Sequence, residues 1–315
     1  MMLARFSHTV ARMTVRCLVG SLVLMCACGA SPLPTPPPYV GELPAASPPK
    51  ELAVYQIPTG VIHRSAAFAY AGGAYSDKRD FAMSAVLVKH PRGDLLIDSG
   101  IGKDVQAHLR TMPYLFRLIT DDQRGRSVAE TLAAVGYDRK RLRGVLLTHA
   151  HWDHVSGLPE LAGTPVLVNA AERRFIDEGG TLTALVRSIP NVQYQQYEFE
   201  GGPYLGFARS HDVYGDGAVV VVPAPGHTPG SVLVFLVLPG GQRYALVGDL
   251  VWQREGLTER RERPWLWRKL GDADPLAVRG LLLHMAALAS RFPSLVMVPA
   301  HEQRAYATMP QLPAE

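Results

Sequence analysis

Short apolar runs alternate along the chain with segments that have helical periodicity. Runs rich in Val, Leu and Ile that are bounded by turn residues indicate buried strands. The four residues at 91–94 contain Pro and Gly, and they predict a hairpin turn between the first two runs. The predicted strands lie at 84–89, 95–98, 144–147, 165–168, 218–222, 231–238, 244–247 and 295–298.

Three segments have the spacing of amphipathic helices. Residues 127–135 form the first, where Ser127 and Glu130 match a capping box. Asn169 can cap a second helix, and residues 275–290 form the clearest late helix. Because helices alternate with strands but hairpins also occur, we expect mixed sheets rather than an all-parallel sheet.

The amino terminus predicts an export signal at residues 1–28. Three arginines and no acidic residue precede an apolar run at 17–27. Cys28 follows this run as in a bacterial lipoprotein signal, which predicts a lipid anchor. Ordinary cleavage near Ala30 and an uncleaved anchor are the alternatives. We therefore expect an exported protein, either periplasmic or a membrane-anchored lipoprotein.

The rest of the chain divides into a linker and one domain. Residues 29–50 are rich in proline, which predicts an extended, weakly packed spacer. Residues 51–315 have the length of a two-layer sandwich with outer helices, and they contain no internal repeat. This segment is the predicted single folded domain.

Composition limits the chemistry of this domain. All three cysteines lie within 1–28, so the domain has no disulfide and no thiolate ligand. Without that segment the formal net charge falls from +4 to +1, because it contains three arginines and no acids. The charge therefore gives no ground for nucleic-acid binding. We expect a small-molecule substrate, no nucleic acid, and membrane contact only through Cys28.

Seven His and Asp side chains form the most informative pattern. Four lie within HAHWDH at 149–154, and each of the others follows an apolar, β-rich run. Imidazole nitrogen and carboxylate oxygen are ligands that suit zinc. Seven groups are too many for one tetrahedral ion, but they suit two ions that share a carboxylate. The predicted metal ligands are His149, His151, Asp153, His154, His227, Asp249 and His301.

Five motifs resemble those of the metallo-β-lactamase superfamily across residues 81–303. They are LLIDSG, LLTHAHWDHVSG, PAPGHTPGS, LVGD and VPAHE. The resemblance implies an α/β fold, an αββα sandwich of two mixed β-sheets with outer helices. It also implies two Zn²⁺ ions. One would be held by His149, His151 and His227, the other by Asp153, His154 and His301, with Asp249 bridging both.

A mechanism follows from this ligand set. Two zinc ions about 3.5–4 Å apart can share a hydroxide that attacks a carbonyl or phosphoryl centre. Asp153 and Asp249 are the predicted catalytic carboxylates, since the resemblance implies that Asp153 orients the hydroxide. Asp98 is predicted to hold the ligand loop in place without binding a metal ion itself.

Differences between this sequence and particular branches of the superfamily narrow the range of expected substrates. An aspartate at 249 disfavours a β-lactam substrate, and the short segment after His301 leaves no room for the helical domain of a glyoxalase II. The chain looks closest to the lactonase and organophosphate-hydrolase branch, so we expect a zinc-dependent hydrolase of small esters or lactones, with phosphoesters as a further class. Trp252 stands where many lactonases have a tyrosine. Tyr214 is a pocket candidate in its place, as are Tyr194, Tyr197 and Tyr204.

Other interpretations remain open. A single-iron sulfur dioxygenase on the same fold is one, and a thioesterase-type hydrolase like glyoxalase II is another. A non-catalytic module is disfavoured because the ligand set is complete. Aromatic stretches at 112–119 and 189–214 are candidate pocket walls or satellite core. Arg260, Arg261 and Arg263 are expected on a solvated face, with contact to an anionic substrate as the alternative.

Overall fold

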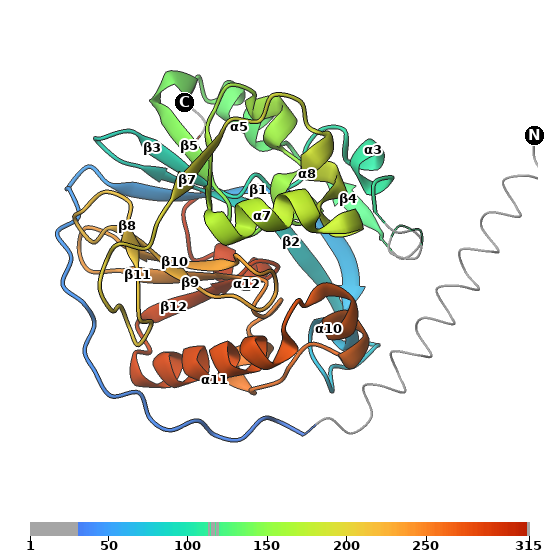
Figure 1. Cartoon of the computed structure of the whole chain (residues 1–315), viewed down its shortest axis with the longest axis vertical. Helices are drawn as coiled ribbons and strands as arrows, with labels where there is room; N and C mark the ends of the chain where they lie inside the picture. The colour runs from blue at the N-terminus through green and yellow to red at the C-terminus, as the bar shows by residue number, and fades with distance from the viewer. Residues whose placement is uncertain (1–30, 113, 115–116, 118–119, 314–315) are drawn as a thin grey trace, which may run out of the picture.

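Two β-sheets stacked face to face form the centre of the computed structural model, and helices cover their outer surfaces (Figure 1). The structure describes residues 31–112, 114, 117 and 120–313. The predicted signal and lipid-anchor cysteine lie outside these residues. Within them, no helix has the length and apolar character that crossing a membrane requires.

The larger sheet has seven strands in the order β4-β1-β2-β3-β5-β6-β7, and the smaller has five in the order β12-β11-β10-β9-β8. Both are mixed, as predicted: β3, β5, β6 and β7 run parallel, as do β11 and β12, whereas the other neighbours are antiparallel. The strands are β1 Ala53–Ser65, β2 Lys78–Lys89, β3 Asp94–Ile97, β4 Asp122–Arg124, β5 Leu142–Leu146, β6 Val166–Asn169, β7 Tyr194–Tyr197, β8 His211–Asp212, β9 Val219–Pro223, β10 Val232–Val237, β11 Arg243–Gly248 and β12 Leu295–Pro299.

Three helices follow the predictions closely. In α5 (Val128–Ala134), Ser127 and Glu130 form the capping box in both directions. The side chain of Asn169 accepts hydrogen bonds from the backbone N–H groups of Ala171 and Glu172 in the first turn of α7 (Ala170–Glu178). The longest described helix is α11 (Pro275–Arg291), capped by Asp274. The shorter helices are α2 Ala66–Ala69, α3 Val105–Leu109, α6 Trp152–Val155, α8 Ala184–Ser188, α9 Glu255–Thr258, α10 Trp265–Gly271 and α12 Gln303–Tyr306, with 3-10 turns at Arg139–Arg141, Leu158–Leu161 and Gly180–Thr183.

Apolar side chains fill three layers of this sandwich. One cluster lies between the sheets and includes Val86, Leu146 and Val234. The second packs α11 on the smaller sheet, and the third packs α5, α7 and α8 on the larger sheet. The αββα prediction is therefore confirmed.

Strand β1 was not predicted, although it makes the most extensive pairing of the larger sheet. Pro58 and Gly60 interrupt its apolar pattern, and its register against β2 shifts between them. Proline cannot donate to a ladder, and glycine often marks a bulge. A Cβ atom at Gly60 would lie 2.6 Å from the carbonyl oxygen of Gln123, so glycine is required where β4 crosses.

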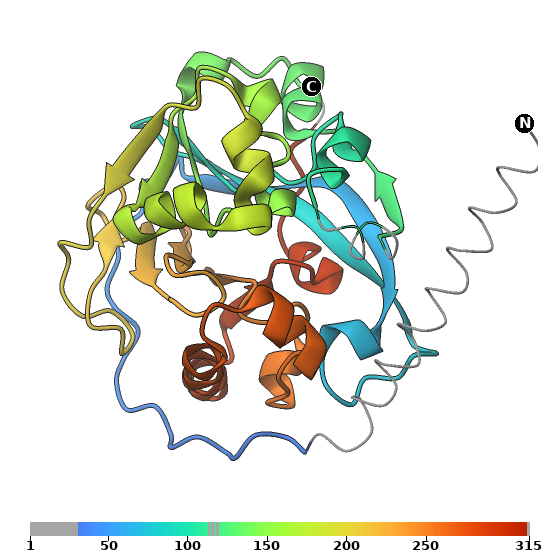
Figure 2. The same ribbon diagram turned by 45° about the vertical axis from the view of Figure 1, so that its right-hand side comes forward.

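The proline-rich segment packs along the domain, contrary to the predicted weakly packed spacer. We call residues 33–47 the strap; Figures 1 and 2 show it in blue, passing under α11 and then beside the smaller sheet. The partly buried positions Leu33, Pro36 and Tyr39 recur every three residues, which is the period of a polyproline II helix. The backbone N–H of Leu33 donates to the carbonyl of Arg260, and Nε of Arg260 donates to the carbonyl of Leu33.

Tyr39 anchors the middle of the strap. Its ring makes edge contacts with His284, at 6.0 Å between centroids, and with Phe292, at 5.9 Å. The neighbouring Val40 is 93% exposed. Aromatic packing rather than chain stiffness therefore holds this segment on α11.

We expect Tyr39→Ala to destabilise the protein by about 1–2 kcal/mol, because half-buried aromatic contacts are lost. Val40→Ala is the matched control and should change the unfolding free energy by less than about 0.5 kcal/mol. Urea unfolding curves measure both values. Equal stabilities for the two variants would show that the strap is not held by this contact.

Candidate metal centre

The seven predicted ligands converge at one edge of the sandwich, each just beyond the end of a strand. His149 follows β5 of the larger sheet, and His151 begins α6, which contributes Asp153 and His154. The remaining ligands follow β9, β11 and β12 of the smaller sheet. The sheets are joined here, since the backbone N–H of Val232 donates to the carbonyl of Thr148 at 3.0 Å.

Three ligand groups share this centre. In each group, one candidate ligand atom per residue lies within 4.8 Å of the others. The groups overlap through His149 and His154, so they form one continuous cluster rather than separate sites. They are His149, His151 and His227; His149, His154 and Asp249; and Asp153, His154 and His301.

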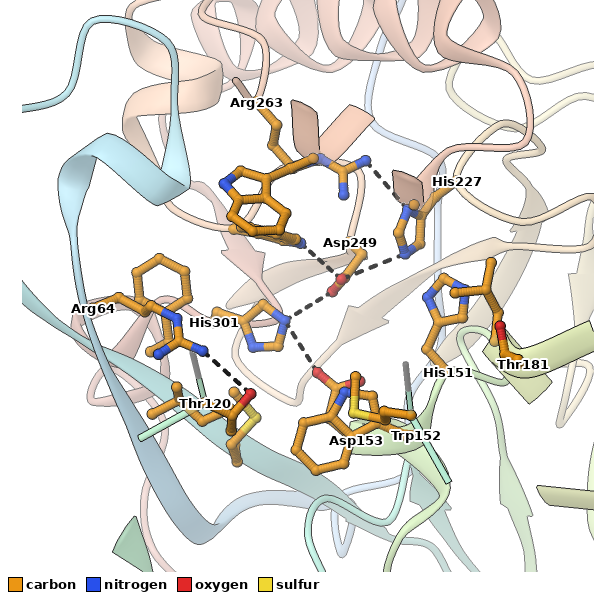
Figure 3. Close-up of a pocket in the computed structure, with 18 residues that line it drawn as sticks. Arg64, Thr120, His151, Trp152, Asp153, Thr181, His227, Asp249, Arg263 and His301 are labelled. Atoms are coloured by element: carbon orange, nitrogen blue, oxygen red, sulfur yellow. Dashed lines mark hydrogen bonds and ion pairs between the residues drawn. The ribbon is translucent and has the colours of Figure 1, made fainter. Parts of the chain in front are cut away.

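Asp249 lies between the two ends of the cluster (Figure 3). Its Oδ1 is 3.2 Å from Nε2 of His301 and 3.4 Å from Nε2 of His154. Its Oδ2 is 3.5 Å from Nε2 of His227. One carboxylate thus faces both ends of the ligand set, which is the arrangement expected of a bridging ligand.

Several of these ligand atoms are buried without a hydrogen-bond partner among the described residues. They are Nε2 of His149, His151, His154 and His227, together with Oδ1 of Asp249. Leaving such groups unpaired costs free energy. A cluster of unpaired nitrogen and oxygen atoms that face one another therefore fits divalent cations, and the donor set suits zinc.

Burial and neighbouring charges set the protonation of the cluster. Burial lowers the pKa of His149, His151 and His227, which favours neutral imidazoles with free lone pairs. Burial alone would raise the pKa of Asp249, but the adjacent histidines outweigh it and hold that pKa well below the usual range. His149, His151, His227 and Asp249 therefore have the protonation states that metal binding requires. Neighbouring carboxylates outweigh burial at His154 and His301 and raise their pKa values, so metal binding there would displace protons.

The opposite ring nitrogens of three histidines are held by fixed acceptors. Asp98 Oδ2 lies 2.8 Å from Nδ1 of His154, and Asp98 also accepts from the backbone and hydroxyl of Thr148. Asp272 Oδ1 lies 2.9 Å from Nδ1 of His227. The carbonyl of Ala82 lies 3.0 Å from Nδ1 of His301. Acceptors at Nδ1 orient each ring so that Nε2 faces the cluster.

Glu172, in the first turn of α7, fastens the two main ligand loops together. Its carboxylate accepts from the backbone N–H of Ala150 at 2.6 Å, the hydroxyl of Thr228 at 2.6 Å and the backbone N–H of Gly230 at 3.1 Å. A Cβ atom at Gly230 would lie 2.1 Å from the backbone nitrogen of Glu172, so only glycine allows this approach. Burial raises the pKa of Glu172 to about 7.

Trp252 lies beside the cluster, and its indole N–H donates to Oδ2 of Asp249 at 2.8 Å. Its ring makes edge contacts with Phe81 and His301, each at 6.0 Å between centroids. The indole therefore orients the carboxylate of Asp249 by this hydrogen bond, and its ring forms part of the pocket wall.

A pocket of about 140 Å³ opens onto the cluster. Metal-binding candidates and apolar side chains together line this pocket, and Figure 3 shows His151, Asp153, His227, Asp249 and His301 around it. The lining residues include Ile62, Phe81, Met83, Met112, His151, Asp153, Leu182, His227, Asp249, Trp252, Arg263, Trp267 and His301.

The structure corrects the suggested tyrosines. The ring of Tyr214 stacks on His90 at 3.7 Å between centroids, and its hydroxyl donates to Gly93 in the β2–β3 turn. It packs there because a large aromatic ring fits under the hairpin. Tyr194, Tyr197 and Tyr204 are also absent from the pocket wall, and no tyrosine of the described residues lines it.

Sequence reasoning also misplaced one arginine and missed two supporting acids. Arg263 is 2% exposed and lines the pocket, contrary to the expected solvated face. Asp272 and Glu172 are distant in sequence from the ligands that they support. Their motifs contain no local signal for that role, since an acidic residue near a helix end is ordinarily a cap.

The αββα fold and this His/Asp cluster define a class of metal-dependent hydrolases. Residues 79–301 match the model of the metallo-beta-lactamase superfamily. Because that match covers well over half of the chain, the protein belongs to this superfamily.

Named relatives are similar over most of the domain. The probable metallo-hydrolase Rv2300c of Mycobacterium tuberculosis is 28% identical over 234 residues, which cover 70% of this chain and 74% of the relative. The N-acyl homoserine lactonase AttM of Rhizobium johnstonii is 25% identical over 183 residues, which cover 55% of this chain and 66% of the relative.

Solved structures share the fold. One is an N-acyl homoserine lactone hydrolase with the product N-hexanoyl-L-homoserine bound at its catalytic metal centre, with a TM-score of 0.62 and 17% identity over 82% of this chain and 97% of that chain. Another is AidC, a dizinc quorum-quenching lactonase, with a TM-score of 0.54 and 16% identity over 82% of this chain and 90% of that chain.

We expect Glu172→Gln to alter the pH dependence of stability. The folded pKa of about 7 lies above the ordinary glutamate value of 4.5. The stability advantage of the wild type is therefore fully present below about pH 4.5 and is lost as pH rises through about 7. Urea unfolding of both metal-free proteins from pH 5 to 8 measures this difference. Glu178→Gln, an exposed site on the same helix, is the control, and a parallel profile for both variants would contradict the expectation.

Trp252→Phe should weaken metal retention by about tenfold, because Asp249 loses a hydrogen bond that orients it. Competition with a chromogenic chelator measures the affinity. The phenyl ring keeps the apolar contact with Phe81, so the free energy of unfolding of the metal-free protein should change little. Unchanged metal affinity would limit the indole to the pocket wall.

Proposed function

We propose that this protein is a hydrolase of small esters or lactones that uses two zinc ions. The observation that carries the proposal is the position of Asp249 between two groups of buried histidines. Four of these histidines have an Nε2 atom without a hydrogen-bond partner among the described residues. Ions held there would lower the pKa of a bound water to about 7 and polarise the carbonyl of the substrate.

The residues of the chain supply position and charge for this chemistry. His149, His151 and His227 would hold one ion, and Asp153, His154 and His301 the other, with Asp249 shared. Asp98 and Asp272 keep the rings of His154 and His227 aimed at the cluster. The apolar wall of the pocket excludes water and accommodates an acyl or aryl group.

Relatives support the ester or lactone class. AttM and the solved neighbours are named as lactonases acting on N-acyl homoserine lactones. Since Trp252 donates to Asp249 and no described tyrosine lines the pocket, the recognition of the substrate differs from a scheme that depends on a tyrosine hydroxyl at this position. We therefore propose the bond class, a carboxylic ester or lactone, and not the homoserine lactone itself.

The second candidate is a single-iron sulfur dioxygenase. It requires only one occupied ligand group, whereas Asp153, His154 and His301 form a further complete group in this chain. Two zinc ions per chain would support the hydrolase, and one iron ion without zinc would support the dioxygenase.

Asp249→Ala and His151→Ala should each lower metal content and reduce kcat/KM for phenyl esters and γ-lactones by more than about 100-fold, since loss of a ligand exceeds loss of a supporting residue. Elemental analysis and a panel of lactones, aryl esters, phosphotriesters and thioesters measure these effects. His63→Ala, a half-exposed histidine outside the pocket, is the control. Full activity in either ligand variant would reject the assigned centre.

A further inference from the structure

Arg263 is a buried cation in the wall of the candidate active-site pocket. Its side chain is 1% exposed, and Figure 3 shows its guanidinium beside His227 and directed toward the centre of the pocket. The guanidinium carbon lies 5.1 Å from the ring of Trp252. Neither the ligand set nor the mechanism above uses this residue.

Only one of its nitrogens is committed to the protein. Nη2 donates to Oδ1 of Asp272, the same oxygen that holds Nδ1 of His227. Nε and Nη1 are buried and have no hydrogen-bond partner among the described residues. A guanidinium carries five N–H donors, so a purely structural ion pair would leave three of them unsatisfied.

The other pocket arginine differs in this respect. Arg64 donates from Nη1 to the carbonyl of His63 at 3.2 Å and from Nη2 to the hydroxyl of Thr120 at 3.4 Å. Both of its terminal nitrogens are therefore engaged by the protein. Arg263 is the pocket arginine whose Nε and Nη1 are buried without a partner among the described residues.

The charge of the pocket indicates what kind of ligand these donors take. The negative charge of Asp272 neutralises the positive charge of Arg263. The carboxylates of Asp153 and Asp249 would not neutralise the positive charge of two divalent cations, so the occupied pocket would have a net positive charge. An oxyanion is the natural partner of a buried, unsaturated guanidinium. The pocket lining also includes the apolar side chains of Ile62, Phe81 and Met83.

We infer that Arg263 is a specificity-determining residue that binds a carboxylate on the substrate, so that the preferred substrates are esters or lactones whose acyl part carries a carboxylate and whose remainder is apolar. This inference rests on the proposed hydrolase function for its kinetic part. The binding of the carboxylate itself does not depend on that function.

The kinetic test uses two phenyl esters that differ in one group, phenyl butanoate and the monophenyl ester of butanedioic acid. The zinc-loaded wild type should prefer the monoanion. Arg263→Met should reduce kcat/KM for the monoanion by about 10- to 100-fold, mainly through KM, because a hydrogen-bonded charge pair is lost. Its effect on the neutral ester should be below about threefold, and Arg263→Lys should recover part of the preference.

Arg254→Met is the matched control, because its side chain is 56% exposed, lies outside the pocket wall and carries the same charge. It should leave the ratio of the two kcat/KM values unchanged. Elemental analysis and melting temperatures of all variants accompany the kinetics, so that loss of metal or of folding is recognised.

A second readout is equilibrium binding of phenylacetate and its neutral isostere phenylacetamide, measured by calorimetry with zinc-loaded and metal-free protein. Arg263→Met should weaken phenylacetate about tenfold in both forms and leave phenylacetamide unaffected. The metal-free form removes direct ligation of the carboxylate by zinc.

The outcomes separate the two ideas. If the wild type hydrolyses neither ester but binds phenylacetate through Arg263, the hydrolase proposal fails and the carboxylate site stands. If Arg263→Met lowers zinc content or affects both probes equally, the residue acts only through Asp272 and His227, and the inference is overturned. Absence of phenylacetate binding to metal-free wild type also overturns it.

Discussion

The buried carboxylate of Asp249 is the interaction on which the rest of the site depends. It follows β11 of the smaller sheet, yet its oxygens face histidines delivered by both sheets. Such a contact forms only if the two sheets stack at a fixed separation and register. The core between the sheets and the hydrogen bond from Val232 to Thr148 provide that constraint, and they position the ligands of both sheets around Asp249.

The ligands and the central strands could be predicted from sequence, because their chemistry and their apolar runs are local signals. His149 to His154 form a compact pattern, and each of the other ligands directly follows a strand. Strand β1 escaped prediction because Pro58 and Gly60 break its alternation. Asp272, Glu172 and Arg263 escaped because their roles arise from packing between distant segments, which no single window of sequence contains.

The environment of His227 shows how one acidic residue couples ligand orientation to the pocket wall. Asp272 Oδ1 meets both the imidazole of His227 and the guanidinium of Arg263. The arginine donates to Oδ1 of this carboxylate without competing for the metal-facing nitrogen of His227, and Oδ2 of Asp272 has no partner among the described residues. The arginine that neutralises a supporting acid therefore remains available to the pocket, whose lining also contains apolar side chains.

The strap fixes how far the domain can lie from anything attached upstream. Leu33 is bonded to Arg260, and five peptide units separate it from Cys28. An extended chain spans about 3.5 Å per residue, so the tether is at most about 18 Å long. A lipid on Cys28 would hold the face formed by α9 and the strap against the headgroups, and diffusion of the enzyme would become two-dimensional.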